Sequence, residues 1–377
     1  MRIGYDLRPF LREETGVGMY LKNLLFHLAR IDPVSEYFLF SSSWKDRFPA
    51  QKIPGFAKMR FRDLRIPVKT LNFLWNSWRW PRLEHFFGRS LDLTHSATPL
   101  ILPTKGKKIV TVHDLFFLDS PALAGVEAGK VFFSRVRKAW RQADGIITFS
   151  SFTKEELAAR FDIKDSKVRV ISHGLDQKFL EELPFADLEE TRRKYDLPSP
   201  FLLFVGAQEP RKNLLRLLEA LKIVHLQGQE ISLVLVGPPG QDSTSLLALA
   251  EKLGLAAWVR STGYLPEEDL RCVYRLAKVF IFPSLSEGFG LPLIEAMASG
   301  VPVAASCAPA IPEIAKEAAL YFRPEDSEGM AEKIILLLES NQARQELIAK
   351  GKKRAQGFSW EKAASETLEF YRSFLEK

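Results

Sequence analysis

The stretch FIFPSLSEGFGLPLIEA, residues 280–296, decides how the second half of the chain folds. An apolar run ends at Pro283, a turn with two glycines follows, and an apolar helical pattern begins at Pro292. Proline suits the first turn of a helix, where its missing N–H has no intrahelical acceptor to lose. A strand, a turn and a helix in this order form the repeating unit of a parallel sheet. Residues 280–296 therefore predict one unit of an α/β fold.

The same pattern recurs along all 377 residues, a length that exceeds one ordinary core. Strands are predicted at 2–6, 37–41, 92–95, 108–112, 145–149 and 168–172, and again at 201–205, 232–236, 259–262, 279–283 and 302–305. Helices are predicted at 18–31, 214–227, 246–253, 267–277, 292–299, 329–339 and 359–377. We predict two Rossmann-like domains, 1–176 and 177–358, with 181–200 in the linker region and the C-terminal helix, 359–377, returning to the first domain.

Composition excludes several classes of protein. Only Cys272 and Cys307 occur, so neither a disulfide framework nor a cysteine metal site is expected. No run approaches the roughly 18 apolar residues of a membrane span, and residues 1–6 read as a strand and not as a signal peptide. We expect a cytoplasmic protein, either free or peripheral on the inner face of the membrane.

The positive charge is concentrated in residues 45–90. This segment holds eleven Lys or Arg and three Asp or Glu, a balance of +8 against +7 for the chain. It also holds Trp75, Trp78 and Trp80. Cations beside aromatics suit an anionic membrane surface, although a helix packed into the domain explains the aromatics equally well. No recognition motif supports nucleic-acid binding.

The turn at 287–291 has the chemistry of a phosphate site. Backbone N–H groups of Gly288, Phe289, Gly290 and Leu291 lie at a predicted helix N-terminus, where the dipole favours anions. Glu287 precedes the turn and Glu295 lies one helical turn beyond it. One carboxylate suits the vicinal hydroxyls of a ribose, and the other can orient a sugar or stabilise positive charge that develops on it.

Four further segments follow predicted strands, at the edge where an open α/β sheet binds ligands. Arg211 and Lys212 stand at a helix start, where cations oppose the dipole and so indicate a bound polyanion such as a diphosphate. Gly237 marks one turn, and Tyr264 and Leu265 follow another. Gly16 and Gly18 form a glycine-rich loop without the third glycine of a dinucleotide fingerprint. His113 stands just beyond a strand end, where it can reach a sugar.

Five segments together resemble the large family of retaining GT-B glycosyltransferases, family 4, group 1. They are TGVGMY (15–20), VHDL (112–115), GIITFSSFTKEEL (145–157), FVGAQEPRKN (204–213) and EGFGLPLIEAMASGVPV (287–303), in the order of the family. The VHDL and EPRKN forms are most similar to those of mannosyltransferases. The resemblance spans nearly the whole chain and implies the two-domain GT-B fold.

The resemblance also implies roles for these residues. Glu295 would bind the ribose of a nucleotide-sugar donor, a GDP- or UDP-sugar, and Glu287 would lie beside the transferred sugar. The diphosphate would be neutralised by Arg211 and Lys212, and His113 would touch the sugar. The base would be lined by Tyr264 and Leu265. The rest of the donor site would be lined by Gly16, Gly18, Gly237 and residues 288–291. The acceptor, a glycan or a lipid-linked glycan, would bind the first domain. No metal and no cofactor are expected, since no Asp-x-Asp occurs.

The sequence departs from the family at three positions: Thr15 and Ala207 replace a common Gly and Arg, and Ser172-His173-Gly174 replaces Pro-Asn-Gly. None removes the central site. Three enzymes remain as alternatives with the same two-domain organisation: a nucleotide-sugar epimerase, a hydrolase and a phosphorylase. The incomplete glycine fingerprint disfavours an NAD enzyme.

Overall fold

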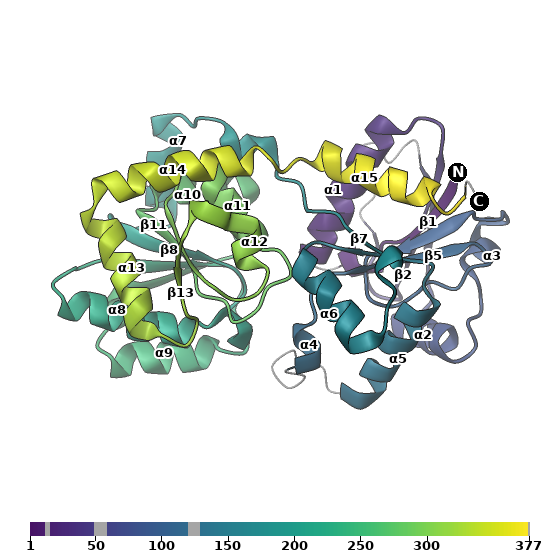
Figure 1. Ribbon diagram of the computed structural model, residues 1–377, viewed down its shortest axis with the longest axis horizontal. Coiled ribbons are helices and arrows are strands. Elements are labelled where there is room, and N and C mark those ends of the chain that lie inside the picture. The colour runs from purple at the N-terminus through teal and green to yellow at the C-terminus, as the bar shows by residue number, and fades with distance from the viewer. Residues whose placement is uncertain (12–15, 49–58, 120–128, 376–377) are drawn as a thin grey trace. The chain divides into compact units, whose positions relative to one another are not determined.

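The computed structural model describes residues 1–11, 16–48, 59–119 and 129–375 (Figure 1). The chain divides into two compact units. Unit 1 comprises Met1–Gly174 and Ser359–Lys377, and unit 2 comprises Leu175–Phe358. The observed division after Gly174 lies two residues before the predicted one at 176.

Unit 1 contains a seven-stranded sheet in which every neighbouring pair is parallel. The spatial order is β3-β2-β1-β4-β5-β6-β7. The strands are β1 (Arg2–Asp6), β2 (Glu36–Ser42), β3 (Arg60–Leu64), β4 (Leu93–Ser96), β5 (Lys107–Val112), β6 (Gly145–Thr148) and β7 (Val168–Val170). The order reverses between β1 and β4, which makes this the topological switch point, where open α/β sheets bind ligands.

Helices cover both faces of this sheet (Figure 1). One face carries α1 (Gly16–Ile31) and the C-terminal helix α15 (Trp360–Arg372), which pack against each other. The other side carries α2 (Val68–Ser77), α3 (Leu83–Phe87), α4 (Phe116–Asp119), α5 (Gly129–Gln142) and α6 (Ser151–Phe161). The predicted return of the C-terminal helix to the first domain is confirmed.

A buried hydrogen-bonded chain fastens α15 to the sheet of unit 1. Tyr371 of α15 shares its hydroxyl with Tyr5 Oη, at 2.6 Å, and with His95 Nδ1, at 2.5 Å. His95 Nε2 lies 2.7 Å from Thr111 Oγ1. Burial lowers the pKa of His95 to about 3, so the ring is neutral and bridges the two hydroxyls as one donor and one acceptor.

Unit 2 contains a six-stranded parallel sheet in the order β10-β9-β8-β11-β12-β13. Its strands are β8 (Phe201–Val205), β9 (Ser232–Val236), β10 (Val259–Gly263), β11 (Val279–Phe282), β12 (Val303–Ser306) and β13 (Leu320–Phe322). Its helices are α7 (Phe185–Lys194), α8 (Leu214–Leu226), α9 (Ser243–Lys252), α10 (Glu267–Leu276), α11 (Leu291–Ala298), α12 (Ile311–Ala315), α13 (Ser327–Glu339) and α14 (Asn341–Ala355). The strand order reverses between β8 and β11.

The predicted fold class is confirmed, with two local corrections. The linker assigned to 181–200 is wrong, because α7 fills much of that stretch and packs against α10. The stretch is rich in charged residues and buries little surface, so it lacks the apolar pattern by which a helix is predicted. The loop assigned to 15–20 is also wrong from Gly16 onward, since α1 begins there, and Thr15 lies outside the described residues. Strands β3 and β13 were not predicted, because charged residues interrupt β3 and β13 is only three residues long.

Candidate active site

Side chains from two neighbouring strands meet at the switch point of unit 2. The strand β8 leads into residues 206–213, and β11 leads into residues 283–290. Parallel neighbours bring the carboxyl ends of their strands to one edge of the sheet. Two segments far apart in the sequence therefore face each other there.

An ion-paired cluster joins these segments. Lys212 Nζ donates to Glu287 Oε1 over 2.5 Å, and Arg211 Nη1 donates to Glu287 Oε2 over 3.2 Å. Lys212 is 6% exposed and Glu287 is 8% exposed. Arg211 also donates from Nε to Glu209 Oε2, at 3.0 Å. One buried carboxylate thus holds both predicted phosphate-binding cations at the sheet edge.

The backbone around Asn213 sets this geometry. Pro210–Lys212 form a single 3-10 turn, and Asn213 takes φ 60° before α8 begins. The Asn213 side chain donates to the carbonyls of Pro283, at 3.0 Å, and Pro324, at 2.7 Å. Leu285 N donates to Arg211 O over 2.8 Å. Asn tolerates the left-handed region better than most residues, and its amide ties the two loops together.

Burial and charge act in opposite directions in this cluster. Burial by itself would raise the pKa of Glu287, but the charges of Lys212 and Arg211 and the Lys212 hydrogen bond outweigh it and lower that pKa. Burial lowers the pKa of Lys212, while Glu287 works against the shift. We therefore treat Glu287 as an ionised carboxylate that compensates the two cations.

The turn after Glu287 opens α11 as predicted, one residue earlier than expected, at Leu291. Gly290 precedes it with φ 98°, a conformation that L side chains rarely adopt. The first backbone N–H groups of a helix have no intrahelical acceptor. Residues 288–291 therefore present amides beside Glu287, at a position where the helix dipole would stabilise a bound phosphate.

Glu295 lies on α11, apart from the ion-paired cluster. Its Oε2 accepts a hydrogen bond of 2.9 Å from Tyr274 Oη of α10. Burial raises the pKa of Glu295 to about 7, and Tyr274 opposes only part of the shift. Tyr274 itself is fully buried. Sequence analysis missed this tyrosine, because nothing in residues 267–277 marks one residue as a partner of Glu295.

Two glycines close the neighbouring strand ends. Gly237 follows β9 with φ 137°, and a Cβ built there would lie 2.2 Å from Gly206 O. Only glycine fits this approach. At the adjacent turn, Tyr264 is 61% exposed whereas Leu265 is 3% exposed. The Tyr264 ring is thus accessible to a flat ligand, and the Leu265 side chain belongs to the interior.

The remaining predicted site residues lie in unit 1. Gly16 and Gly18 belong to the first turn of α1. His113 follows β5, and its Nε2 lies 2.9 Å from the Ala97 carbonyl, so Nε2 carries the proton. Burial lowers the pKa of His113 to about 4. His113 is therefore neutral near pH 7, and its Nδ1 is an acceptor.

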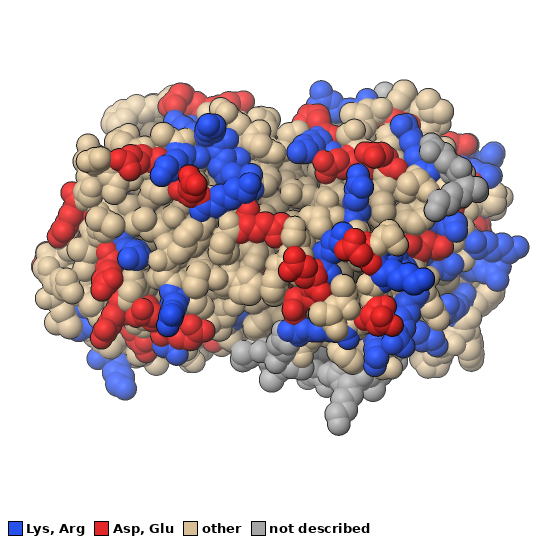
Figure 2. Space-filling model, viewed as in Figure 1, with Lys and Arg blue, Asp and Glu red and all other residues tan. Residues whose placement is uncertain are grey.

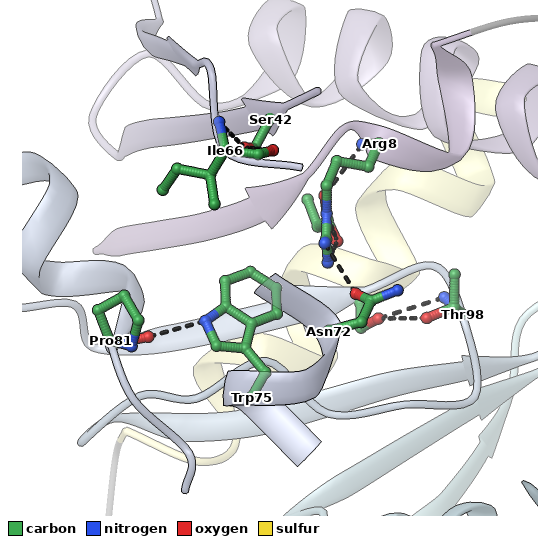
Figure 3. Close-up of polar contacts among 9 residues, drawn as sticks. Arg8, Ser42, Ile66, Asn72, Trp75, Pro81 and Thr98 are labelled. Atoms are coloured by element: carbon green, nitrogen blue, oxygen red, sulfur yellow. Dashed lines mark hydrogen bonds and ion pairs between the residues drawn. The ribbon is translucent and has the colours of Figure 1, made fainter. Parts of the chain in front are cut away.

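The switch point of unit 1 holds a cluster that sequence analysis did not predict (Figure 3). Arg8 donates from Nη2 to Asp6 Oδ2, at 2.6 Å, and from Nη1 to Asn72 Oδ1, at 2.9 Å. Its Cζ lies 4.4 Å from the centre of the Trp75 ring. Next to Arg8, a cavity of about 970 Å³ is lined by residues from three strand ends, among them Trp44, Lys45 and Lys69.

Two kinds of feature are absent from the described residues. Within these ranges, no helix is both long and apolar enough to span a membrane. The same residues include no group of three or more His, Cys, Asp or Glu that could hold a metal ion.

Comparison with known proteins assigns the chain to a family. Residues 15–179 match the model of Glycosyltransferase Family 4, and residues 187–354 match that of Glycosyl transferases group 1. The O-antigen chain mannosyltransferase B of Escherichia coli is 28% identical over 381 residues, which cover 99% of this chain and 100% of that protein.

Solved structures agree on the fold. Sucrose-phosphate synthase from Thermosynechococcus elongatus matches with a TM-score of 0.79 at 22% identity, over 100% of this chain and 99% of that one. Anabaena HepE in complex with UDP and glucose matches with a TM-score of 0.76 at 18% identity, over 99% of this chain and 100% of that one. The two family models together span most of the chain, and the fold is that of the solved structures, so the chain belongs to the GT-B glycosyltransferases of family 4, group 1.

Proposed function

We propose that this glycosyltransferase moves a hexose from a nucleotide-diphosphate sugar to an acceptor hydroxyl, with retention of configuration and without a metal ion. The observation that carries the proposal is the buried cluster of Lys212, Arg211 and Glu287 at the switch point of unit 2. Two cations held by one carboxylate suit a diphosphate leaving group, whose negative charge grows as the glycosidic bond breaks.

The reaction follows from these charges. The bond between the anomeric carbon and the diphosphate oxygen breaks, and the acceptor oxygen forms the new bond on the same face of the sugar. The acceptor proton passes to the departing phosphate oxygen. In this proposal Lys212 and Arg211 stabilise the leaving group and replace a metal cation, while Glu287 faces the positive charge that develops on the sugar.

The nucleoside is assigned to the other end of α11. Glu295 accepts hydrogen bonds from the two ribose hydroxyls, and the exposed ring of Tyr264 stacks on the base. Gly237 leaves room for the backbone to approach the donor, and Leu265 contributes through its backbone, because its side chain is buried. The amides of residues 288–291 bind phosphate oxygens.

Unit 1 supplies the acceptor side and one contact to the sugar. His113 Nδ1 accepts a hydrogen bond from a sugar hydroxyl, in the tautomer set by the Ala97 carbonyl. The first turn of α1, with Gly16 and Gly18, contributes backbone amides. The cavity beside Arg8 lies at the edge where such sheets bind ligands, and Trp44, exposed in its wall, suits the apolar face of a glycan or lipid-linked glycan.

The similarity to a mannosyltransferase over the full chain favours mannose as the sugar and GDP-mannose as the donor. The name of that relative refers to an O-antigen chain. We therefore propose that the reaction belongs to the synthesis of a cell-surface polysaccharide or glycolipid. The UDP and glucose in the HepE structure make a UDP-sugar the second donor to test.

Peripheral contact with an anionic membrane is also part of the proposal. Both interpretations of the aromatics in residues 45–90 have support: Trp75, Phe86 and Phe87 pack in a hydrophobic cluster, whereas Phe73, Trp78 and Trp80 are exposed. Residues 49–58 of this segment lie outside the described residues. Exposed aromatics beside cations suit the surface of such a membrane.

The function is tested with purified protein, GDP-mannose, UDP-glucose and a panel of glycan acceptors, in EDTA. We expect one donor to raise the melting temperature and to be converted to a nucleoside diphosphate and a glycoside of unchanged anomeric configuration. Lys212→Ala should abolish conversion, whereas Lys252→Ala, an exposed lysine of α9, should not. Hydrolysis or epimerisation without transfer would identify an alternative enzyme, and dependence on added metal would refute the metal-free mechanism.

A further inference from the structure

A second cavity in unit 1 gathers four cations. Its volume is about 330 Å³, and its wall includes Arg79, Arg82, Lys108 and Lys138, beside the apolar surfaces of Trp75, Trp78, Leu100 and Ile101. Lys138 comes from α5, whereas Arg79 and Arg82 follow α2. Figure 2 shows Lys and Arg gathered over the part of unit 1 where α2 and α5 lie in Figure 1.

Among the residues that the structure describes, no carboxylate lines this cavity. Across the described residues, no ion pair joins any of the four cations to Asp or Glu. Arg79 donates to the neutral amide of Gln142, and Lys108 Nζ donates to Gly106 O over 3.4 Å. Four like charges around one cavity repel one another. An anion bound among them would remove that cost.

Two carboxylates among the described residues contact the wall at positions other than its cationic side-chain groups: Asp144 Oδ2 accepts from Lys108 N over 2.9 Å, and Glu84 is bonded through Oε1. Glu84 accepts from Thr104 Oγ1 over 2.6 Å and from Lys105 N over 2.8 Å. These bonds fix the loop that carries Thr104, which lines the cavity. Glu84 therefore shapes the wall through Oε1, and within the described ranges it forms no ion pair with any of the four cations.

The chain is constrained where it supplies the arginines. Trp75 Nε1 donates to the Pro81 carbonyl over 2.8 Å, which holds the turn after α2 against the domain (Figure 3). Within that turn Arg79 takes φ 53°. A residue other than glycine is strained in this conformation. Such strain persists only where the surrounding structure imposes it, and here it places a guanidinium on the cavity.

The cavity lies away from the edge of the sheet that carries His113. Lys108 stands near the start of β5, and His113 follows the end of the same strand. Five residues of extended strand span about 16 Å. Lys108 is thus far from His113, and this cavity shares no lining residue with the cavity beside Arg8, although Trp75 of its wall contacts Arg8.

We infer that this cavity binds a phosphate ester, with Arg82 and Lys108 as its inner contacts and Arg79 and Lys138 at its mouth. Arg82 and Lys108 are half-buried, whereas Arg79 and Lys138 are exposed. A phosphate carries a charge of about −1.5 to −2 near pH 7 and three acceptor oxygens, which several N–H donors can share. Trp78, 68% exposed, offers an apolar surface to the group esterified to it.

The phosphate ester can be a free metabolite or the headgroup of a lipid, and two arms of one experiment separate these sources. In the first arm, sn-glycerol 3-phosphate is added to the full chain at constant ionic strength. We expect the melting temperature to rise by about 2 to 4 °C at ten times the dissociation constant. In the second arm, vesicles of phosphatidylglycerol or of phosphatidylcholine are sedimented with the protein.

Three variants assign the effect to this cavity. The double variant Arg82→Gln with Lys108→Gln should abolish the rise in melting temperature. The control, Arg89→Gln with Lys164→Gln, removes the same charge from exposed positions outside the cavity and should keep that rise. Lys212→Ala, in unit 2, should also leave it. Melting temperatures without ligand show whether each variant folds.

Each outcome decides the inference. A rise lost only in the cavity variant supports it, and retention on phosphatidylglycerol vesicles, lost in the same variant, identifies a lipid headgroup as the source. Failure of both arms overturns it, as does an equal loss in the charge-matched control. A rise in melting temperature that is lost only in Lys212→Ala would place the ester in the proposed donor site instead. A failure of this inference can therefore be told apart from a failure of the proposed function.

Discussion

Lys212 Nζ lies 2.5 Å from Glu287 Oε1, and the two residues stand 75 positions apart in the sequence. Both side chains are buried, so neither charge can be solvated by water when the other is removed. The pair therefore ties the loop after β8 to the loop after β11. The same pair sets the charge of the proposed diphosphate site.

Lys212→Met should weaken folding and abolish transfer. Glu287 would keep only Arg211 as a cationic partner, so we expect a loss of about 2 to 3 kcal/mol in the free energy of unfolding. Transfer should fall by at least about 100-fold. Urea denaturation and donor turnover measure the two effects.

The double variant Lys212→Met with Glu287→Gln separates folding from chemistry. It should recover most of the stability, because the buried carboxylate that lost Lys212 is no longer charged, and none of the activity. A double variant as unstable as Lys212→Met would contradict the ion-pair account. Lys252→Met, on the surface of α9, is the control for a lost lysine.

Glu295 should make donor binding depend on pH near neutrality. Its pKa is about 7, raised by burial, and the ribose hydroxyls bind the carboxylate. Donor affinity should therefore fall as pH decreases from 8 to 6, and Glu295→Gln should bind weakly with a flat profile. Titration calorimetry over this range measures both. A wild-type affinity that does not vary between pH 6 and 8 would argue against ribose binding by Glu295.

The same pKa predicts a change in stability. Since the folded-state pKa exceeds the ordinary value of 4.5, the stability that protonated Glu295 contributes is complete below about pH 4.5 and is lost as pH rises through 7. Glu295→Gln lacks this dependence, so its melting temperature relative to wild type should increase from pH 5 to pH 8. A constant difference would refute the raised pKa.

Gly237→Ala should destabilise unit 2. The new Cβ would lie 2.2 Å from Gly206 O, and the residue would keep φ 137°. We expect a loss of about 2 to 4 kcal/mol together with weaker donor binding, because both strand ends must shift. Gly254→Ala is the matched control, with φ 71° and no atom within 4 Å, and should cost about 1 kcal/mol. Equal effects would mean that backbone conformation alone matters.

Tyr371→Phe should loosen the C-terminal helix from unit 1. The lost hydroxyl bridges Tyr5 and His95 in the interior, and removing one member of a buried network costs about 1 to 3 kcal/mol. Tyr321→Phe removes a hydroxyl bonded to the Lys316 carbonyl near the surface and should cost less. Hydrogen exchange of α15 should accelerate in the first variant only; unchanged exchange would show that packing suffices to hold the helix.

Much of the fold could be predicted because its signals are local. The apolar runs at 201–205, 232–236 and 279–283 correspond to β8, β9 and β11 within a residue, since buried parallel strands need continuous apolar side chains. Helix α7 was missed for the opposite reason: it buries little, so it lacks the apolar stripe on which such predictions depend.

The sequence by itself determined the two α/β units, the glycine turn before α11 and the residue types of the proposed donor site, because each of these lies within one strand–turn–helix unit. Only the tertiary structure decided that Lys212 pairs with Glu287, that Tyr274 bonds to Glu295 and that four cations converge near α2 and α5. Such contacts depend on which strands become neighbours and how the helices pack over them, and burial then sets the strength of each charge.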